Sequence, residues 1–306
     1  WRDAPELMAY ITRCQSYLQW GKPDNDFLVY LPVRDLWKND TRNWLMQFDI
    51  HSMARKAPQF IKTILDIDKA GFDCDYISDQ YLLTTTFTEG MLQTAAGTRY
   101  KGIIIPANAT LPDDVALHVE LLRQQGAKII VGDDKAAMGT AAKPEAMKRD
   151  MGLKMIRRSN DEGHHYFIAN LTDHDIDCRV PLAVAEKNAL WYNPMTDRTY
   201  EASINSDGLE IRLRSGESRI LLCSDTKHEA EKEKRLTDRE IDLTGNKWQL
   251  SFTEEEPKVG ETFTLNGLQT WESLNDAASK TMGTGIYETT FKLSKDDAAK
   301  EWVIDL

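Results

Sequence analysis

The sequence predicts a protein of mixed class, with an α/β domain followed by two all-β regions. In the first half, short apolar runs such as "FLVYLPV" (27–33) and "YKGIIIP" (100–106) alternate with amphipathic segments of helical period. Runs that are apolar on both faces are typical of buried parallel strands. Further along, "LEIRLR" (209–214) alternates apolar and charged residues, which favours antiparallel strands with one buried face.

The chain opens with a predicted helix at residues 1–22. Apolar residues recur at four-three-four spacing from Leu7 to Leu18 and form one stripe. Gly21 and Pro23 are typical of a helix end.

Residues 23–150 are predicted to form a doubly wound, flavodoxin-like domain, because buried strands alternate with helices along the chain. Glu89-Gly90 indicates the turn of a hairpin inserted in this domain. The expected strands lie at 27–33, 72–77, 100–106 and 127–133, and the expected helices at 50–70 and 111–125.

The remaining residues divide into three regions. Residues 151–223 show short alternating strands separated by turn residues and predict a small antiparallel β-sandwich. Residues 224–240 are charged and almost without apolar side chains, which predicts a solvated linker. Alternation resumes in 241–306, where we expect part of a second, jelly-roll β-sandwich.

Composition excludes several classes of protein. A formal net charge of −11 disfavours nucleic-acid binding, which needs a basic surface for phosphates. The four cysteines form no CxxC pair, so neither a zinc ribbon nor a thioredoxin-type site is expected. No apolar run is long enough for a membrane span. No motif indicates a cofactor or a metal.

"GFDCDYISD" (71–79) raises the question of a catalytic thiol at Cys74. A nucleophilic cysteine needs a lowered pKa, whereas its neighbours Asp73 and Asp75 are negatively charged. On a strand both carboxylates point away from the face that Cys74 occupies. Cys74 is therefore predicted to be a packed strand residue.

Carboxylates near the end of this strand allow a different role. Ligands of parallel α/β sheets bind outside the carboxyl ends of the strands, which makes Asp75 and Asp79 candidate contacts for a cleft. Solvated aspartates that bind nothing are the simpler interpretation. The spacing of these carboxylates with Asp73 is not that of an EF-hand.

The segment "RDLWKNDTRNWL" (34–45) is predicted to be a loop that follows the first parallel strand. Aromatic side chains next to polar ones suit sugar binding, so Trp37 and Trp44 are candidate carbohydrate contacts. Tryptophans that pack the loop onto a neighbouring domain are at least as consistent with the pattern. His164 and His165 are adjacent and face opposite sides of a strand, so no shared metal is expected there.

The order of these segments resembles part of a large glycoside hydrolase. "WRDAPELMAYITRCQSYLQW" resembles the last helix of a catalytic barrel, and residues 23–150 resemble the α/β domain known as the β-galactosidase trimerisation domain. "LTGNKWQLSF" and "GTGIYETTFKL" are similar to the start of a sugar-binding jelly roll of glycoside hydrolase family 2. The combination most resembles the bacterial α-L-rhamnosidases of glycoside hydrolase family 106.

The resemblance implies a non-catalytic segment of a secreted or periplasmic enzyme that degrades plant-type polysaccharides. Its partner would be an N-terminal catalytic barrel of the same polypeptide, and homo-oligomer formation is implied too. No catalytic residue carries over, because the implied catalytic carboxylates belong to the barrel. Two alternatives stay open: a stand-alone carbohydrate-binding or scaffold protein, and a small-molecule-binding domain of flavodoxin or amidotransferase type.

Overall fold

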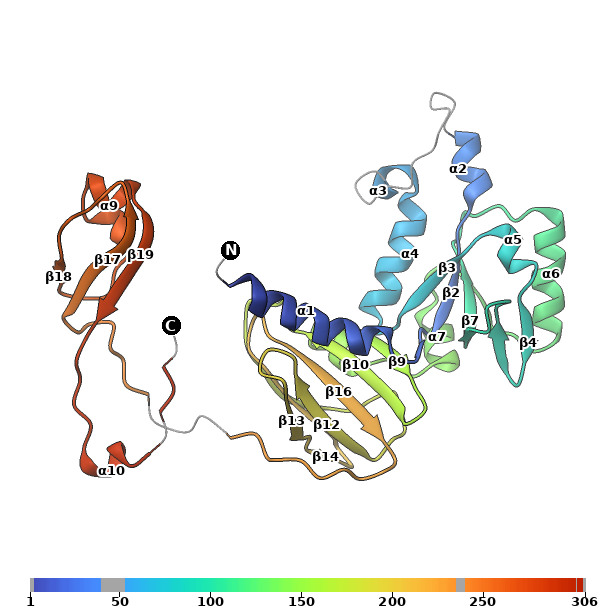
Figure 1. Ribbon diagram of the computed structural model, residues 1–306. Helices are drawn as coiled ribbons and strands as arrows, with labels where there is room; N and C mark the ends of the chain where they lie inside the picture. Colours follow the sequence, from blue (N-terminus) through green and yellow to red (C-terminus); the bar gives the residue numbers. More distant parts are fainter. Residues whose placement is uncertain (1–2, 40–52, 235–239, 301, 305–306) are drawn as a thin grey trace. The chain divides into compact units, whose positions relative to one another are not determined.

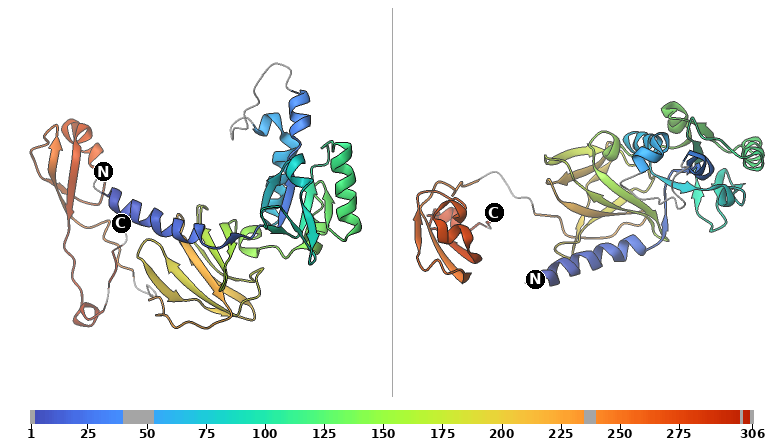
Figure 2. Two further views of the ribbon diagram at one scale, coloured as in Figure 1. Left: turned by 45° about the vertical axis from the view of Figure 1, so that its right-hand side comes forward. Right: turned by 90° about the horizontal axis from the view of Figure 1, so that it is seen from above.

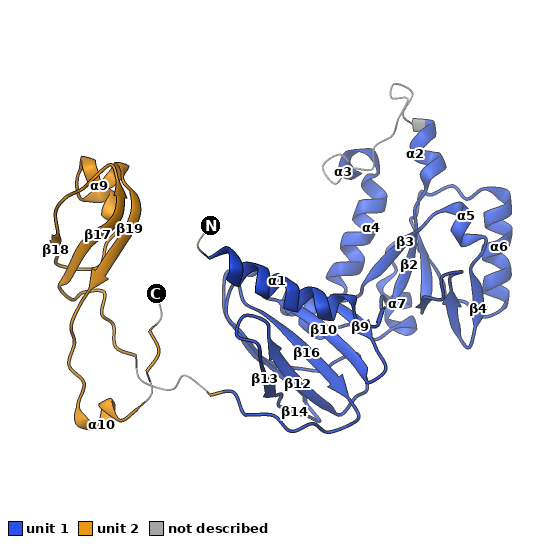
Figure 3. Ribbon diagram, in the orientation of Figure 1, with its two compact units in different colours: residues 1–233 blue, residues 234–306 orange. Residues whose placement is uncertain are grey.

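The structure is a computed structural model that describes residues 3–39, 53–234, 240–300 and 302–304. The chain divides into two compact units, residues 1–233 and residues 234–306 (Figure 3). Unit 1 holds a parallel α/β sheet and a β-sandwich, and unit 2 holds a small antiparallel sheet. The predicted combination of α/β and all-β structure is confirmed.

The parallel sheet of unit 1 has four strands in the spatial order β3-β2-β7-β8. Every neighbouring pair is parallel. The four residues of β2 and of β7 are all buried, as expected for strands that are covered on both faces. The strands are β2 (Phe27–Tyr30), β3 (Cys74–Ile77), β7 (Gly102–Ile105) and β8 (Ile129–Val131).

Helices cover both faces of this sheet (Figure 1). On one face, Phe60 and Ile67 of α4 pack with Val29 and Ile104 of the sheet. On the other face, Val115 of α6 packs in a core that contains other residues of the same strands. The helices of this part are α2 (Val33–Asn39), α3 (Met53–Lys56), α4 (Pro58–Lys69), α5 (Asp79–Leu82), α6 (Asp113–Gln124), α7 (Lys135–Ala141) and α8 (Ala146–Arg149).

A small antiparallel sheet is inserted between β3 and β7. It consists of β4 (Thr86–Thr88), β5 (Met91–Gln93) and β6 (Arg99–Tyr100). Glu89 and Gly90 connect β4 to β5 with φ of 51° and 77°. Two successive positive φ values are typical of a tight hairpin turn, so the predicted hairpin is confirmed.

The sandwich of unit 1 consists of two antiparallel sheets. Its larger sheet has the order β1 (Lys22–Pro23), β9 (Lys154–Ser159), β10 (Gly163–Ala169), β16 (Ser218–Ser224), β12 (Asn188–Asn193) and β13 (Arg198–Glu201). Its smaller sheet has the order β11 (Ile176–Val180), β15 (Gly208–Leu213) and β14 (Ile204–Asn205). Leu209, Ile211 and Leu213 point into the common core, as their alternation predicts.

Helix α1 (Ala4–Gln19) lies along the larger sheet of the sandwich (Figure 2). The Tyr10 hydroxyl is 2.6 Å from the Ser218 hydroxyl, and the ring of Tyr17 contacts that of Tyr192 with centroids 5.0 Å apart. Cys14 is the buried residue of the predicted stripe, whereas Leu7 is exposed. The helix therefore buries one narrow face, mostly near its C-terminal end.

Residues 33–39 differ from the prediction, and the start of the predicted linker has partners in the sandwich. Residues 33–39 form α2 and are not a loop, because Leu36 is buried and the Asp35 carboxylate accepts a hydrogen bond from the Thr110 amide at 2.7 Å. The first part of the predicted linker follows the sandwich: Glu231 forms a bridge with Tyr200, and Arg219 binds Glu233 at 2.8 Å.

Unit 2 contains one three-stranded antiparallel sheet of the order β18-β17-β19. Its elements are β17 (Trp248–Glu256), β18 (Phe263–Leu265), the 3-10 turn η1 (Trp271–Ser273), α9 (Asp276–Lys280), β19 (Met282–Glu288) and α10 (Lys295–Ala298). Within the described part of unit 2 this sheet has no second sheet facing it. The predicted partial sandwich is therefore represented by a single layer.

Candidate functional site

The carboxyl end of the parallel sheet was the first place where the sequence predicted ligand contacts. Asp79 lies there, but protein groups already bind both of its carboxylate oxygens. The Tyr30 hydroxyl donates to Oδ1 at 2.5 Å, and Arg34 Nε lies 2.9 Å from Oδ2. Asp79 thus ties the segment after β2 to the segment after β3.

Asp75 is bound in the same way but by a different partner. The Tyr100 hydroxyl donates a hydrogen bond to Asp75 Oδ2 at 2.7 Å. The structure therefore gives each of the two predicted carboxylates its own tyrosine. Trp37 is 62% exposed on α2, and Trp44 lies outside the described residues.

Cys74 is a poor nucleophile in this environment. Its side chain packs against the core on the α4 face of the sheet, opposite the face on which Tyr100 binds Asp75. Burial and then the charge of Asp73 raise the pKa of the thiol to about 12. At neutral pH the side chain is therefore the protonated thiol.

Asp73, the remaining carboxylate of this stretch, binds a buried lysine. Lys148 Nζ bonds to the Asp73 carboxylate, donates to the Phe72 carbonyl at 2.7 Å and lies 3.0 Å from Asp68. Burial alone would lower the pKa of Lys148, but the carboxylates of Asp73 and Asp68 raise it. The pair joins the residue before β3 to α8.

Four charged side chains of unit 1 form what we call the Arg157 cluster: Asp24, which is half-buried, and Asp26, Glu145 and Arg157, which are buried. The guanidinium lies 2.6 Å from Asp24 Oδ2, 2.9 Å from Asp26 Oδ1 and 2.9 Å from Glu145 Oε1. The side chains of Arg157 and Asp26 are each 2% exposed and that of Glu145 is 1% exposed.

The Arg157 cluster joins the α/β part of unit 1 to its sandwich. Arg157 lies on β9 of the sandwich, Asp24 and Asp26 lie between β1 and β2, and Glu145 precedes α8. Burial alone would lower the pKa of Arg157, but Asp26 and Asp24 raise it, so the guanidinium stays charged. A second layer of bonds completes the cluster: Lys101 Nζ lies 2.8 Å from Asp26, and the Tyr166 hydroxyl donates to Glu145 at 2.8 Å.

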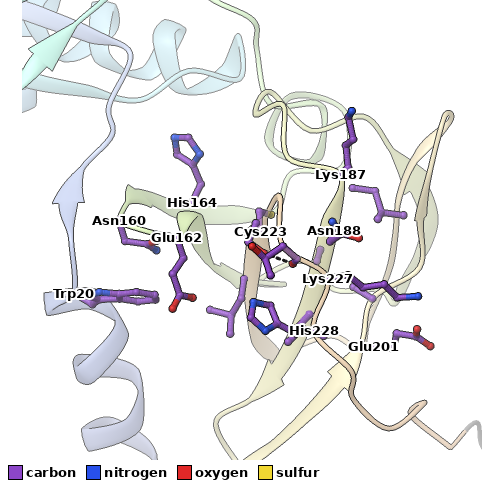
Figure 4. Close-up of a pocket in the computed structure, with 17 residues that line it drawn as sticks. Trp20, Asn160, Glu162, His164, Lys187, Asn188, Glu201, Cys223, Lys227 and His228 are labelled. Carbon is purple, nitrogen blue, oxygen red and sulfur yellow. Dashed lines mark hydrogen bonds between the residues drawn. The ribbon is translucent and has the colours of Figure 1, made fainter.

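A pocket of about 390 Å³ opens at the ends of β10, β12 and β16 (Figure 4). Trp20, which follows α1, lines it together with the β9–β10 turn, the start of β12 and the segment after β16. Half-buried apolar side chains, Leu190, Ile204 and Leu222, contribute to the lining. Its charged members are two glutamates and two lysines: Glu162, Glu201, Lys187 and Lys227.

The indole of Trp20 stacks on an imidazole, that of His165, which two hydrogen bonds hold in place. The ring stacks on His165 with centroids 5.0 Å apart and an interplanar angle of 15°. His165 Nε2 lies 2.8 Å from the Tyr17 carbonyl, and its Nδ1 lies 2.8 Å from Asn160 Nδ2. Because Asn160 Oδ1 accepts the amides of Glu162 and Gly163, its NH₂ group donates to Nδ1, and neutral His165 carries its proton on Nε2.

His164 lies on the other side of β10 and links the pocket to the Arg157 cluster. It lines the pocket, its Nδ1 bonds to Glu186, and its Nε2 is 3.5 Å from Asp24 Oδ2. The two adjacent histidines thus face opposite ways, as their position on a strand predicts. The described residues contain no group of three or more His, Cys, Asp or Glu that could hold a metal ion.

The sequence did not reveal this pocket or the Arg157 cluster. The residues of each come from segments far apart along the chain, and none belongs to a motif.

In the part of the chain that the structure covers, no helix is long and apolar enough to cross a membrane.

Comparison with known proteins finds similarity at the level of the fold. No family model matches the chain, and no curated protein matches its sequence. A solved rhamnosidase from Novosphingobium sp. PP1Y is similar in structure, with a TM-score of 0.62 and 15% sequence identity. The match covers 94% of this chain and 31% of the rhamnosidase, so this chain spans less than a third of that protein's length.

A second solved structure is more distant. Gan42B, a GH42 beta-galactosidase, has a TM-score of 0.38 and 10% identity, over 65% of this chain and 40% of that one. The comparison with the rhamnosidase indicates a glycoside-hydrolase-like fold.

Proposed function

We propose that this chain is a non-catalytic accessory segment of a polysaccharide-degrading glycoside hydrolase. The observation that carries the proposal is the match of nearly the whole chain, 94%, to 31% of a rhamnosidase. A segment that accounts for such a share of a larger enzyme suits a supporting role next to the part that performs hydrolysis.

The chemistry of unit 1 supports this role. Glycoside hydrolysis needs two carboxyl groups that flank a cleft, one of them a sheltered acid. Asp75 and Asp79 are each bound to protein partners, and the glutamates that line the pocket, Glu162 and Glu201, are exposed. The Arg157 cluster, whose guanidinium binds three carboxylates, suits a rigid support.

The finer assignment follows from the resemblance to glycoside hydrolase family 106. The parent enzyme would be an exported α-L-rhamnosidase, and its catalytic barrel would precede this segment. The α/β part of unit 1 would be of flavodoxin-like type. The segment would support the barrel, shape one rim of its cleft or mediate assembly into oligomers.

An assay of aryl α-L-rhamnoside hydrolysis tests the proposal. It compares the 306-residue chain with the polypeptide encoded by its full reading frame. We expect the full polypeptide to release the aryl group and the chain alone to release none. An Arg157→Met variant of the full polypeptide should lose activity on heating faster than an Arg123→Met variant, because Arg123 pairs with Glu120 on the exposed surface of α6.

Two results would contradict the proposal. Turnover by the chain alone, abolished by Glu162→Gln or Glu201→Gln, would place catalysis in this segment. A full reading frame that encodes no further domain would leave the chain without an enzyme to support.

A further inference from the structure

We propose that the pocket lined by Trp20 binds a small, uncharged saccharide. The inference goes beyond the proposed supporting role and does not depend on it, because it concerns the pocket of unit 1 alone. The pocket has a volume of about 390 Å³, near the lower end of the roughly 300–1,000 Å³ usual for small-molecule sites. A ligand of one or two rings is therefore expected.

Trp20 supplies the aromatic surface that such a ligand needs. Sugar rings have apolar C–H faces, which pack on flat aromatic side chains and displace water from them. His165 stacks on one face of the indole and Tyr17 contacts it edge-on, and Trp20 is one of the residues that line the pocket (Figure 4). The hydrogen bonds of His165 to Tyr17 and Asn160 fix the imidazole, and the ring contacts of Trp20 with His165 and Tyr17 restrict the indole, so little side-chain entropy is lost on binding.

The polar lining matches hydroxyl groups, which both donate and accept hydrogen bonds. Glu162 and Glu201 can accept, whereas Lys187 and Lys227 can donate. Asn188 can do both. A polyol needs this mixture, while a phosphate or a fatty acid would not.

The balance of charge favours an uncharged ligand. Two carboxylates and two ammonium groups give the lining no net formal charge when its histidines are neutral. A strongly anionic ligand would meet Glu162 and Glu201, and a cationic one would meet Lys187 and Lys227. An uncharged saccharide avoids both repulsions.

The segment after β16 makes one wall of the pocket. Thr226, Lys227 and His228 belong to the region that the sequence predicts to be a solvated linker. The Ser224 hydroxyl donates to the Thr226 carbonyl at 2.6 Å, and the Glu201 amide donates to the Glu231 carbonyl at 2.8 Å. These bonds hold a polar segment along the sandwich, and a ligand bound there would contact it.

Isothermal titration calorimetry of the full 306-residue chain tests this proposal. The uncharged probes are L-rhamnose, D-galactose, D-glucose and cellobiose, and the charged probes are D-glucuronate and D-glucosamine. We expect at least one uncharged probe to bind at a single site with a Kd of about 1 mM or lower, and more tightly than either charged probe. Trp20→Ala should weaken that binding by roughly tenfold or more.

Two further variants distinguish binding in this pocket from binding elsewhere on the chain. Trp37→Ala removes the exposed tryptophan of α2 and should leave the Kd unchanged, which also tests Trp37 as a carbohydrate contact. Glu162→Ala combined with His228→Ala removes two exposed side chains of the lining. It should weaken binding several-fold while the melting temperature stays the same, so a loss of folding in Trp20→Ala cannot account for the result.

The proposal is overturned if no uncharged probe binds, or if a charged probe binds more tightly. It is also overturned if Trp37→Ala weakens binding while both pocket variants bind normally. Saccharide binding by a chain whose full reading frame encodes no glycosidase would support the pocket and contradict only the proposed function.

Discussion

Replacement of Arg157 by methionine tests whether the Arg157 cluster holds unit 1 together. The variant keeps an apolar side chain of similar length but removes a guanidinium that bonds to Asp24, Asp26 and Glu145. Removal of one partner from a buried ion cluster leaves uncompensated charge and costs about 3–5 kcal/mol. We expect the free energy of unfolding to decrease by an amount in that range. It should not decrease further, because Lys101 still pairs with Asp26 and Tyr166 still donates to Glu145.

The expected loss can be measured by differential scanning calorimetry. For a unit of this size, 1 kcal/mol corresponds to about 2–4 °C in Tm, so the transition of unit 1 should move down by about 6–20 °C. Arg123→Met is the matched control: its partner Glu120 is exposed, and exposed pairs contribute about 0–1 kcal/mol. A double variant, Arg157→Met with Glu145→Gln, should recover part of the loss because it removes one buried charge.

If the free energy of unfolding of Arg157→Met decreased by less than about 1 kcal/mol, the reasoning would be refuted, because the loss of an exposed ion pair has an effect of that size. A double variant less stable than the single one would contradict the reasoning too, because it would show that the Glu145 carboxylate still stabilises the fold through Tyr166 and the Ala183 amide when Arg157 is absent.

Three further predictions concern single residues of unit 1. Because burial raises the pKa of Cys74 to about 12, a maleimide should label this thiol at neutral pH far more slowly in the folded chain than in urea. Burial also lowers the pKa of His165, so the unfolded chain binds this proton more readily and stability should fall as the pH drops below about 6.5. His165→Gln should flatten that part of a urea-denaturation pH curve. Gly71→Ala should cost about 1–3 kcal/mol, measured by urea denaturation, because φ is +89° and the new Cβ would lie 2.8 Å from the Glu145 carbonyl oxygen.

Each of these predictions can be contradicted. A pH curve of His165→Gln that matches that of the unsubstituted chain would contradict the assignment to His165. Gly90→Ala combines φ of +77° with open space, so it should cost less than Gly71→Ala. Fast labelling of Cys74 in the folded chain would show that the thiol is not buried.

The fold was predictable where local sequence determines it. The buried strands are short and continuously apolar, and the Glu89-Gly90 turn needs residues that tolerate positive φ. The helix α2 was missed because its support comes from elsewhere in the sequence, from Thr110 and Asp79. The place of Glu231 beside β13 was not predicted, because a backbone hydrogen bond to Glu201 and a bridge to Tyr200 hold it, and these need no apolar side chain.

The polar sites were harder to predict because their partners are far apart in the sequence. Hydropathy would place Ile156 inside and Arg157 outside, yet Ile156 is 46% exposed and Arg157 is buried. What reverses the pattern is a set of carboxylates 12 to 133 positions away along the chain. No local window contains Arg157 together with all three of its carboxylates.

The carboxylates of "GFDCDYISD" (71–79) are likewise bound by partners that lie far away in the sequence. Each of the three carboxylates has a protein partner from another segment: Lys148 for Asp73, Tyr100 for Asp75, and Tyr30 with Arg34 for Asp79. A carboxylate that is already bound in this way gains little from a ligand, because the ligand must first replace an existing bond. The exposed glutamates of the Trp20 pocket carry no such cost, so a cluster of acidic residues in a sequence is weaker evidence for binding than a cavity whose polar lining faces water.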